Sequence, residues 1–232
     1  MKTITEYLKK GGLTIIGGRP AMGKTTFALN LAEELTHQNH PVLYCMLEMD
    51  KEDVIQKYNY NGSFLVDDTP RQKVSGIRDI LQKLKDESNP ITTLIIDYLQ
   101  LMDAAPSKQN RGEEILQILQ DLKSMAIEED ITIIATSQLG RTSEKRKVEA
   151  QHIDDLRFSS GWEEIVDSVF LLYRPEYYGI YEDEIGETKN RMDVLMTHLR
   201  GRHCRTINYE YDKALKNYHK GTFATKYIST IK

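Results

Sequence analysis

Residues 13–35 read LTIIGGRPAMGKTTFALNLAEEL. The stretch begins with an apolar run typical of a buried strand and ends in a helical pattern, in which apolar residues recur at i, i+3, i+4 and i+7. Between them, residues 18–25 match the pattern G-x-x-x-x-G-K-[ST] of a phosphate-binding loop. The strand before the loop and the helix after it favour this interpretation over a glycine-rich turn in which Thr25 only caps a helix.

The chemistry of such a loop depends on backbone N–H groups that converge on phosphate oxygens at the start of a helix. We expect Lys24 to neutralise the β- and γ-phosphates of ATP, and the Thr25 hydroxyl to ligate Mg²⁺. The residues expected to contact the nucleotide are Gly18, Arg19, Pro20, Ala21, Met22, Gly23, Lys24, Thr25 and Thr26.

A second apolar run, Leu-Ile-Ile-Asp at residues 94–97, ends in an acid. Asp97 would emerge at the C-terminal end of a buried strand, where a carboxylate can hold Mg²⁺ through water. Runs of this kind are common, but one that follows a phosphate-binding loop is informative. The predicted metal ligands are therefore Thr25 and Asp97, and the predicted cofactors are ATP and Mg²⁺.

The composition is that of a globular protein. The chain has 232 residues, of which 40% are hydrophobic and 28% charged, and its formal net charge of −4 provides no overall basic field for nucleic acid. The two cysteines, Cys45 and Cys204, are too few for a disulfide framework. The N-terminus lacks the apolar region of a signal peptide, and no run approaches a membrane span, so we expect a cytoplasmic protein without a membrane partner.

Short strand-like runs alternate with helical patterns along most of the chain, which predicts an α/β fold with a mostly parallel central sheet flanked by helices. The later runs follow one another directly, which predicts an antiparallel C-terminal extension at one edge. We expect one domain over residues 1–232, with a core at about 13–212 and a basic tail at 213–232, and a loop at 177–191. The expected strands span residues 13–17, 42–47, 93–97, 131–136, 166–174, 193–199 and 206–211.

Several strings resemble the ATPase domain of DnaB-type replicative helicases. The most specific is Asp-Tyr-Leu-Gln-Leu-Met at residues 97–102, and the others occur in the same order as in that family. They lie at residues 18–31, 47–49, 137–139, 155–157 and 172–178. The resemblance implies a RecA-like P-loop core that assembles into a hexameric ring with ATP at subunit interfaces.

The resemblance also implies roles for three further side chains. Glu48 would be the general base that activates the attacking water, and Gln138 would sense the γ-phosphate; the alternatives are a surface glutamate and a loop-capping glutamine. Arg200 falls where the family has an arginine finger that reaches the neighbouring subunit's γ-phosphate. The family's lysine two residues earlier is replaced by His198, for which Arg202 can compensate.

The DNA-contacting loop of the family aligns with residues 155–167. We expect Arg157, Phe158, Ser160 and Gly161 to contact the backbone of single-stranded DNA, with Ser159 among them. Phe158 stands where the family tends to have an acidic residue; it can stack on a base or pack against Trp162. A basic cluster, Arg141, Lys145, Arg146 and Lys147, adds attraction for DNA or is a solvated loop face.

Two hypotheses for function follow. The first is a helicase motor domain that couples ATP hydrolysis to binding and movement on single-stranded DNA, with replication or mobile-element proteins as further partners. The second is a nucleotide-gated assembly module without unwinding activity of its own; a small-molecule kinase is a third, less supported alternative. The chain begins close to the first core strand, without the family's N-terminal collar domain, so we expect an excised or stand-alone ATPase domain.

Overall fold

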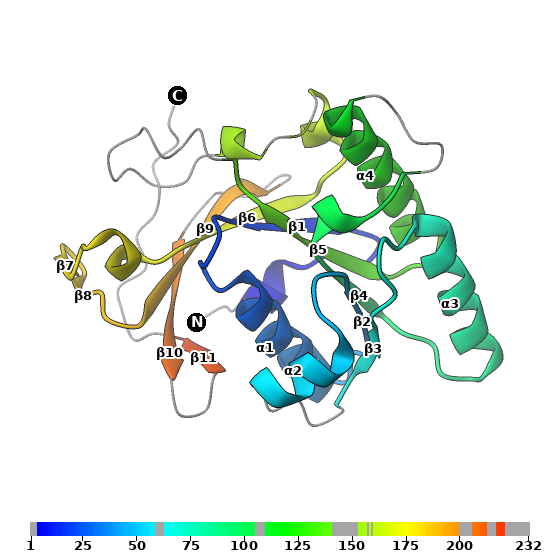
Figure 1. The fold of residues 1–232 in the computed structure, drawn as a ribbon, viewed down its shortest axis with the longest axis horizontal. Helices are drawn as coiled ribbons and strands as arrows, with labels where there is room; N and C mark the ends of the chain where they lie inside the picture. Colours follow the sequence, from blue (N-terminus) through cyan, green and yellow to red (C-terminus); the bar gives the residue numbers. More distant parts are fainter. Residues whose placement is uncertain are drawn as a thin grey trace.

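A nine-stranded sheet runs through the centre of the computed structural model, which describes residues 4–58, 63–104, 110–140, 153–156, 158, 160–199, 206–212 and 217–220 (Figure 1). In their spatial order, the strands are β11 (Asn217–Lys220), β10 (Thr206–Asp212), β9 (Arg191–Leu199), β6 (Ser168–Tyr173), β1 (Leu13–Gly18), β5 (Thr132–Gln138), β4 (Thr93–Asp97), β2 (Val42–Met46) and β3 (Leu65–Asp67).

The strands from β6 to β3 in this order are parallel to their neighbours. The sequence predicts this for β1, β2, β4 and β5, whereas β3 was not predicted. The carboxyl ends of the parallel strands therefore meet at one edge of the sheet. β1 lies between β5 and β6, so the chain that leaves β1 has neighbouring strand ends on both sides. In open α/β sheets ligands bind outside this edge.

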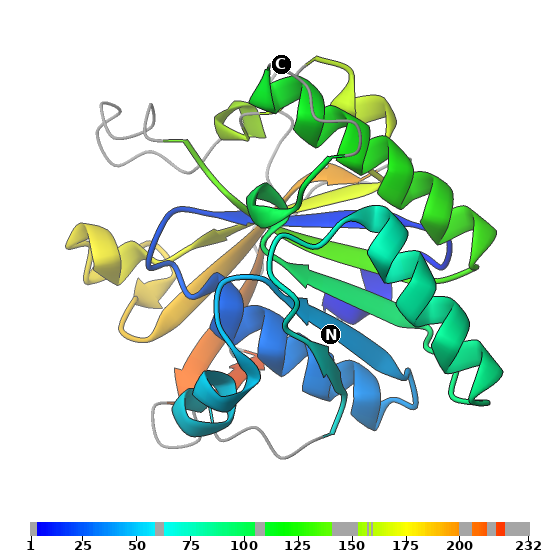
Figure 2. The same cartoon turned by 45° about the vertical axis from the view of Figure 1, so that its right-hand side comes forward.

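Helices cover both faces of the sheet (Figures 1 and 2). α3 (Val74–Asp86) and α4 (Arg111–Glu128) pack on one face, while α1 (Lys24–His37) and the short α2 (Lys51–Tyr58) lie on the other. Because successive side chains of a strand point to opposite faces, Ile15 belongs to the cluster under α3 and α4, and Ile16 to the cluster under α1. This is why the parallel strands are apolar throughout.

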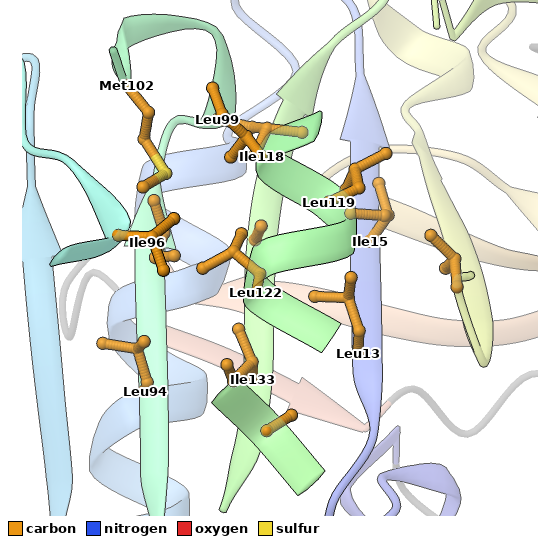
Figure 3. Close-up of a cluster of buried hydrophobic side chains, with 14 of the residues drawn as sticks. Leu13, Ile15, Leu94, Ile96, Leu99, Met102, Ile118, Leu119, Leu122 and Ile133 are labelled. Atoms are coloured by element: carbon orange, nitrogen blue, oxygen red, sulfur yellow. The ribbon is translucent and has the colours of Figure 1, made fainter. Parts of the chain in front are cut away.

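Figure 3 shows how α4 seals its face of the sheet. Ile118, Leu119 and Leu122 lie over side chains of β1, β4 and β5, and all of them are buried. Leu99 and Met102, which follow β4 in the short 3-10 helix η2 (Leu99–Leu101) and just after it, close the same cluster near the carboxyl edge. The segment that follows Asp97 is thus fixed by packing.

The antiparallel extension that the sequence predicts consists of β9, β10 and β11. One detail differs: the first of the three runs expected there, β6, is parallel to β1, and antiparallel pairing begins only with β9. The sheet also continues beyond residue 212, because β11 pairs with β10 and packs against α1, where the Tyr218 N–H donates to Asn30 Oδ1 at 2.7 Å.

The segment expected as a loop at residues 177–191 contains regular structure. η6 (Pro175–Tyr178) leads to a small hairpin of β7 (Glu182–Asp183) and β8 (Gly186–Glu187), before β9 begins at Arg191. Arg191 is fully buried and pairs with Asp183 of the hairpin and with Asp193 of its own strand. Within the described residues, no helix is long and apolar enough to cross a membrane.

Candidate nucleotide-binding site

The loop that follows β1 has the backbone conformation of a phosphate-binding loop. Ala21 and Gly23 have φ angles of 61° and 84°, in the left-handed region, so the chain curls tightly between β1 and α1. The Met22 N–H donates to the Arg19 carbonyl at 3.3 Å, and the Met22 side chain is buried. α1 begins at Lys24, and because the first N–H groups of a helix have no intrahelical acceptor, those of this first turn are available to a phosphate.

Lys24 lies back across the loop it follows. Its ammonium donates to the Arg19 carbonyl at 3.0 Å, a neutral acceptor that a phosphate oxygen can replace. A Cβ at Gly18 would stand 3.2 Å from Lys24 Cγ, so the glycine makes room for the lysine stem. Burial lowers the pKa of Lys24, and the charges of Asp97 and Glu48 oppose that shift.

Asp97 is held at the end of β4 by two hydroxyl groups. It is 2% exposed, and its carboxylate accepts from Tyr44 Oη at 3.0 Å and from Thr136 Oγ1 at 2.5 Å. One hydroxyl comes from β2 and the other from β5, the strands on either side of β4. Each carboxylate oxygen keeps a further lone pair, so the fixed carboxylate can still accept from metal-bound water.

Glu48 lies just beyond the end of β2, next to Asp97 in the sheet. Met46 is the register partner of Asp97, and the Leu47 N–H donates to the Asp97 carbonyl at 2.9 Å. The Glu48 side chain is exposed. Its charge and that of Asp97 both raise the pKa of Tyr98, after burial, which is the larger cause. The two carboxylates therefore share one electrostatic environment with Lys24.

Gln138 ends β5 directly beside the phosphate-binding loop, since it is the register partner of Gly18. Its backbone is clamped by Gln100, whose amide donates to the Ser137 hydroxyl at 2.9 Å and to the Gln138 carbonyl at 3.1 Å. The Gln138 N–H in turn donates to Gln100 Oε1 at 3.2 Å. The Gln138 side chain is exposed, so the strand end is fixed and the side chain faces outward.

Three contacts of this site were not predicted. Gln100 lies in the string Asp-Tyr-Leu-Gln-Leu-Met of residues 97–102, but no pattern predicts that it fixes the end of β5. Arg111 holds Gln100 by donating to its carbonyl at 2.7 Å. Arg19 of the loop lies 3.4 Å from the Tyr178 hydroxyl, and a Cβ at Gly23 would stand 2.8 Å from the Tyr218 hydroxyl. Both tyrosines lie more than 150 positions after the loop in the sequence, so no local signal indicates these contacts.

The residues of the site fit ATP with a magnesium ion. The left-handed loop, the space left by Gly18 and the ammonium on a neutral acceptor form a cradle for phosphate oxygens. Among the described residues there is no cluster of three or more histidines, cysteines or acids that could hold a metal. Magnesium bound here would take ligands from Thr25, Asp97 and the nucleotide, which is usual for this ion at phosphate sites.

The expected DNA loop is described only in part. Arg157 and Arg200 lie outside the described residues, as do Ser159, Arg202 and the basic cluster at residues 141–147. Phe158 is partly buried and packs edge-to-face on Trp162, with ring centroids 5.7 Å apart, so of its two expected contacts the structure has the one with Trp162. Ser160 and Gly161 are exposed, and Gly161 has a φ of 96° that favours glycine.

The model of the DnaB-like helicase C terminal domain family matches residues 1–63 and 57–220. A probable replicative DNA helicase of Trieres chinensis is 33% identical over 91% of this chain and 54% of its own length. The replicative DNA helicase DnaB of Geobacillus stearothermophilus is 31% identical over 94% of this chain and 53% of its own length. The chain thus spans about half the length of these curated relatives.

Solved structures agree with these matches. One solved ATPase domain superposes with a TM-score of 0.81 at 28% identity, covering 91% of this chain and 86% of that domain's chain. A DnaB-like replicative helicase, solved in a study of its interactions with primase, gives a TM-score of 0.80 at 28% identity and covers 91% of this chain and 59% of its own. The predicted RecA-like α/β fold and the family resemblance are both confirmed.

Proposed function

The chain belongs to the family of DnaB-like helicase C-terminal domains, and from this premise we propose that it is the ATP-hydrolysing motor of a DNA helicase. It would bind ATP with Mg²⁺ at the loop after β1 and couple hydrolysis to movement on single-stranded DNA. The observation that supports this most directly is the meeting of Lys24, Glu48, Asp97 and Gln138 at the carboxyl ends of neighbouring strands.

Each of these side chains has a distinct task in the proposal. Lys24 would exchange the Arg19 carbonyl for phosphate oxygens and balance their charge. Asp97, oriented by Tyr44 and Thr136, would hold metal-bound water. When bound with Thr25 as a ligand, Mg²⁺ would neutralise charge on the β- and γ-phosphates. Glu48, exposed beside Asp97, would take a proton from the attacking water.

Gln138 would report the state of the nucleotide to the chain that follows β5. Its backbone is tied to Gln100, and the next residues are tied to the start of the segment that aligns with the DNA loop, because the Gly140 N–H donates to the Asp155 carbonyl at 2.9 Å. Movement of the strand end would therefore be passed to residues 153–156. This connection supports coupling between hydrolysis and a DNA-contacting loop.

The partners in this proposal are single-stranded DNA and further copies of the chain. DNA would be held by Arg157, Phe158, Ser160 and Gly161, and a hexameric ring would place Arg200 of one subunit at the nucleotide of the next. Replication proteins, such as a primase, or proteins of a mobile element are further candidates.

The test is ATP hydrolysis by the full chain with and without oligothymidylate, at two salt concentrations. We expect stimulation by the oligonucleotide and binding that weakens with salt, because phosphate contacts release counterions. Hydrolysis that oligothymidylate does not stimulate, together with the absence of salt-sensitive binding, would contradict the proposal of a DNA motor. ATP-dependent assembly in that case would support the nucleotide-gated module instead.

A further inference from the structure

A chain of aromatic rings connects the expected DNA loop to the strand that leads to Arg200. Phe158 packs edge-to-face on Trp162, with centroids 5.7 Å apart and planes at 81°. Trp162 in turn packs on His198, with centroids 6.2 Å apart and planes at 62°. Both distances lie in the range at which aromatic pairs attract one another. His198 lies in β9, two residues before Arg200.

Trp162 is fixed in the core while it makes these contacts. Its side chain is 5% exposed and belongs to the buried cluster that includes Val166, Val169 and Leu195 of the β6 and β9 region. Its carbonyl accepts from the N–H groups of Ile165 and Val166, both at 3.0 Å. Because cores are close-packed, a displacement of the indole has to move its neighbours.

A hydrogen bond runs parallel to the ring contacts. Nε2 of His198 lies 3.3 Å from the Val166 carbonyl, so in this contact Nε2 is the donor. Val166 follows the turn that Trp162 begins, η5 (Trp162–Glu164). His198 is therefore joined to this turn twice, through its ring face and through a ring nitrogen.

The end of β9 is also irregular where His198 lies. Val169 pairs with His198 and Phe170 with Met196, which leaves Thr197 as an extra residue in β9. Such a bulge bends its strand and re-aims the residues beyond it. The bulge at Thr197 thus sets the direction of the end of β9. The contacts of His198 with Trp162 and Val166 hold this end of the strand in place.

We propose that Trp162 is a positioning residue, which transmits the displacement of Phe158 by DNA to His198 and so sets the position of Arg200. This deepens the proposed function and rests on it, since it needs both a DNA loop and an arginine finger. DNA that moves Phe158 away from the indole changes the packing of Trp162, and His198 follows through two contacts. Hydrolysis is then stimulated because Arg200 is placed correctly, while nucleotide binding at Lys24 is unaffected.

The first test is Trp162→Leu in the full chain. We expect the stimulation of hydrolysis by oligothymidylate to fall by about fivefold or more, while the basal rate and the affinity for oligothymidylate, measured by fluorescence anisotropy, stay within about twofold. Trp162→Phe should keep the stimulation, because a ring remains between Phe158 and His198. Tyr7→Leu is the matched control, since it removes a buried ring from the other hydrophobic cluster, and it should keep the stimulation as well.

Normal stimulation in folded Trp162→Leu would overturn this inference and leave the proposed function standing. A wild-type chain that does not bind oligothymidylate would overturn both. A purely structural role of Trp162 predicts loss of stability, seen by circular dichroism on heating, with stimulation unchanged per folded molecule.

The wild-type protein offers a second test that holds even if Trp162→Leu does not fold. Trp162 is the only tryptophan of the chain, so fluorescence excited at a wavelength that tyrosine does not absorb reports its surroundings alone. We expect oligothymidylate to change its emission, and a non-hydrolysable ATP analogue to change it as well. At a concentration of oligothymidylate that saturates the variant, as measured by fluorescence anisotropy, Phe158→Leu should remove the change caused by oligothymidylate and keep the change caused by the nucleotide. Emission that bound oligothymidylate leaves unaltered would overturn the inference, whatever the effect of the nucleotide.

Discussion

At the scale of single residues, the proposed roles fall to different side chains: Lys24 binds the phosphates, and Glu48 takes part in hydrolysis. Burial lowers the pKa of Lys24, whose ammonium donates to a neutral carbonyl. An incoming phosphate would stabilise this poorly solvated cation. Glu48 is exposed, so we expect its side chain to contribute little to the stability of the fold. A substitution of Lys24 should therefore lower the affinity for nucleotide, whereas a substitution of Glu48 should lower turnover and leave the affinity unchanged.

Lys24→Ala should weaken nucleotide binding by about tenfold or more, because a charge-assisted hydrogen bond contributes roughly 1.5–3 kcal/mol. The fold should remain, because Tyr44 and Thr136 still donate to the buried Asp97 carboxylate and the Met22 N–H still donates to the Arg19 carbonyl. Titration with a fluorescent ATP analogue measures the affinity, and thermal unfolding checks the fold. Lys10→Ala, which removes a surface ion pair with Asp130, is the control and should bind normally.

Glu48→Gln should keep ATP binding and lower kcat by about 10²–10⁴-fold, as expected when a general base is removed. Steady-state hydrolysis and nucleotide titration separate the two quantities. Glu52→Gln changes an exposed acid in α2, four residues further on, and should leave both unchanged. Turnover that Glu48→Gln leaves intact would refute the assignment of this residue as the base.

The residues of the phosphate site that the sequence predicts carry local signals. Lys24 follows a glycine pattern, Asp97 ends an apolar run, and Glu48 follows another. The contacts of Arg19 with Tyr178 and of Tyr218 with Gly23 have no such signal, because they depend on how η6 and β11 are placed by the rest of the sheet. Sequence reasoning therefore identifies the residues that bind phosphate and misses the side chains packed around them.

At the scale of elements, the same distinction explains which strands could be predicted. The central parallel strands are apolar on both faces, so their runs stand out within a residue or two of the observed bounds. β11 reads Asn-Tyr-His-Lys, and α2 reads Lys-Glu-Asp-Val-Ile-Gln-Lys-Tyr; neither has a marked apolar pattern. Their structure depends on tertiary contacts, such as the pairing of β11 with β10.

The β7–β8 hairpin is anchored to β9 by one buried cation. Arg191 is 0% exposed, and both Asp183 and Asp193 pair with it. The hydrogen bond from Arg191 is the main reason that the pKa of Asp183 is lowered. Burial raises the pKa of Asp193, against the charge of Arg191. Removing the guanidinium would leave two carboxylates without their shared partner.

Arg191→Met should reduce the free energy of unfolding by about 3–5 kcal/mol, the usual cost of breaking a buried ion pair from one side. Urea unfolding followed by circular dichroism measures the change. Arg71→Met is the control, because Arg71 is 80% exposed and its pair with Asp103 should contribute about 0–1 kcal/mol. Equal effects of the two substitutions would show that the pairs of Arg191 contribute no more than a surface pair.

At the scale of the whole molecule, we propose that a second copy of the chain completes the nucleotide site. Lys24, Glu48 and Asp97 belong to one subunit, whereas Arg200 is proposed to act on the nucleotide of its neighbour. In a closed ring with head-to-tail contacts, the site of every subunit would receive its Arg200 from one neighbour, and every subunit would supply Arg200 to the other. Hydrolysis should therefore depend on assembly, and two defects located in different subunits should compensate for one another.

Mixing Arg200→Ala with Lys24→Ala tests this directly. Each variant alone should hydrolyse little ATP, but in mixed rings an intact loop can meet an intact arginine at about a quarter of the interfaces, so a similar share of wild-type activity should return. Size-exclusion chromatography with a non-hydrolysable ATP analogue establishes that rings form. Mixing Lys24→Ala with Glu48→Gln is the control: both defects lie within one subunit's half of the site, so no interface is complete. Recovery of activity in this control would contradict an arginine finger that acts between subunits. So would assembled rings of Arg200→Ala with Lys24→Ala that recover no activity.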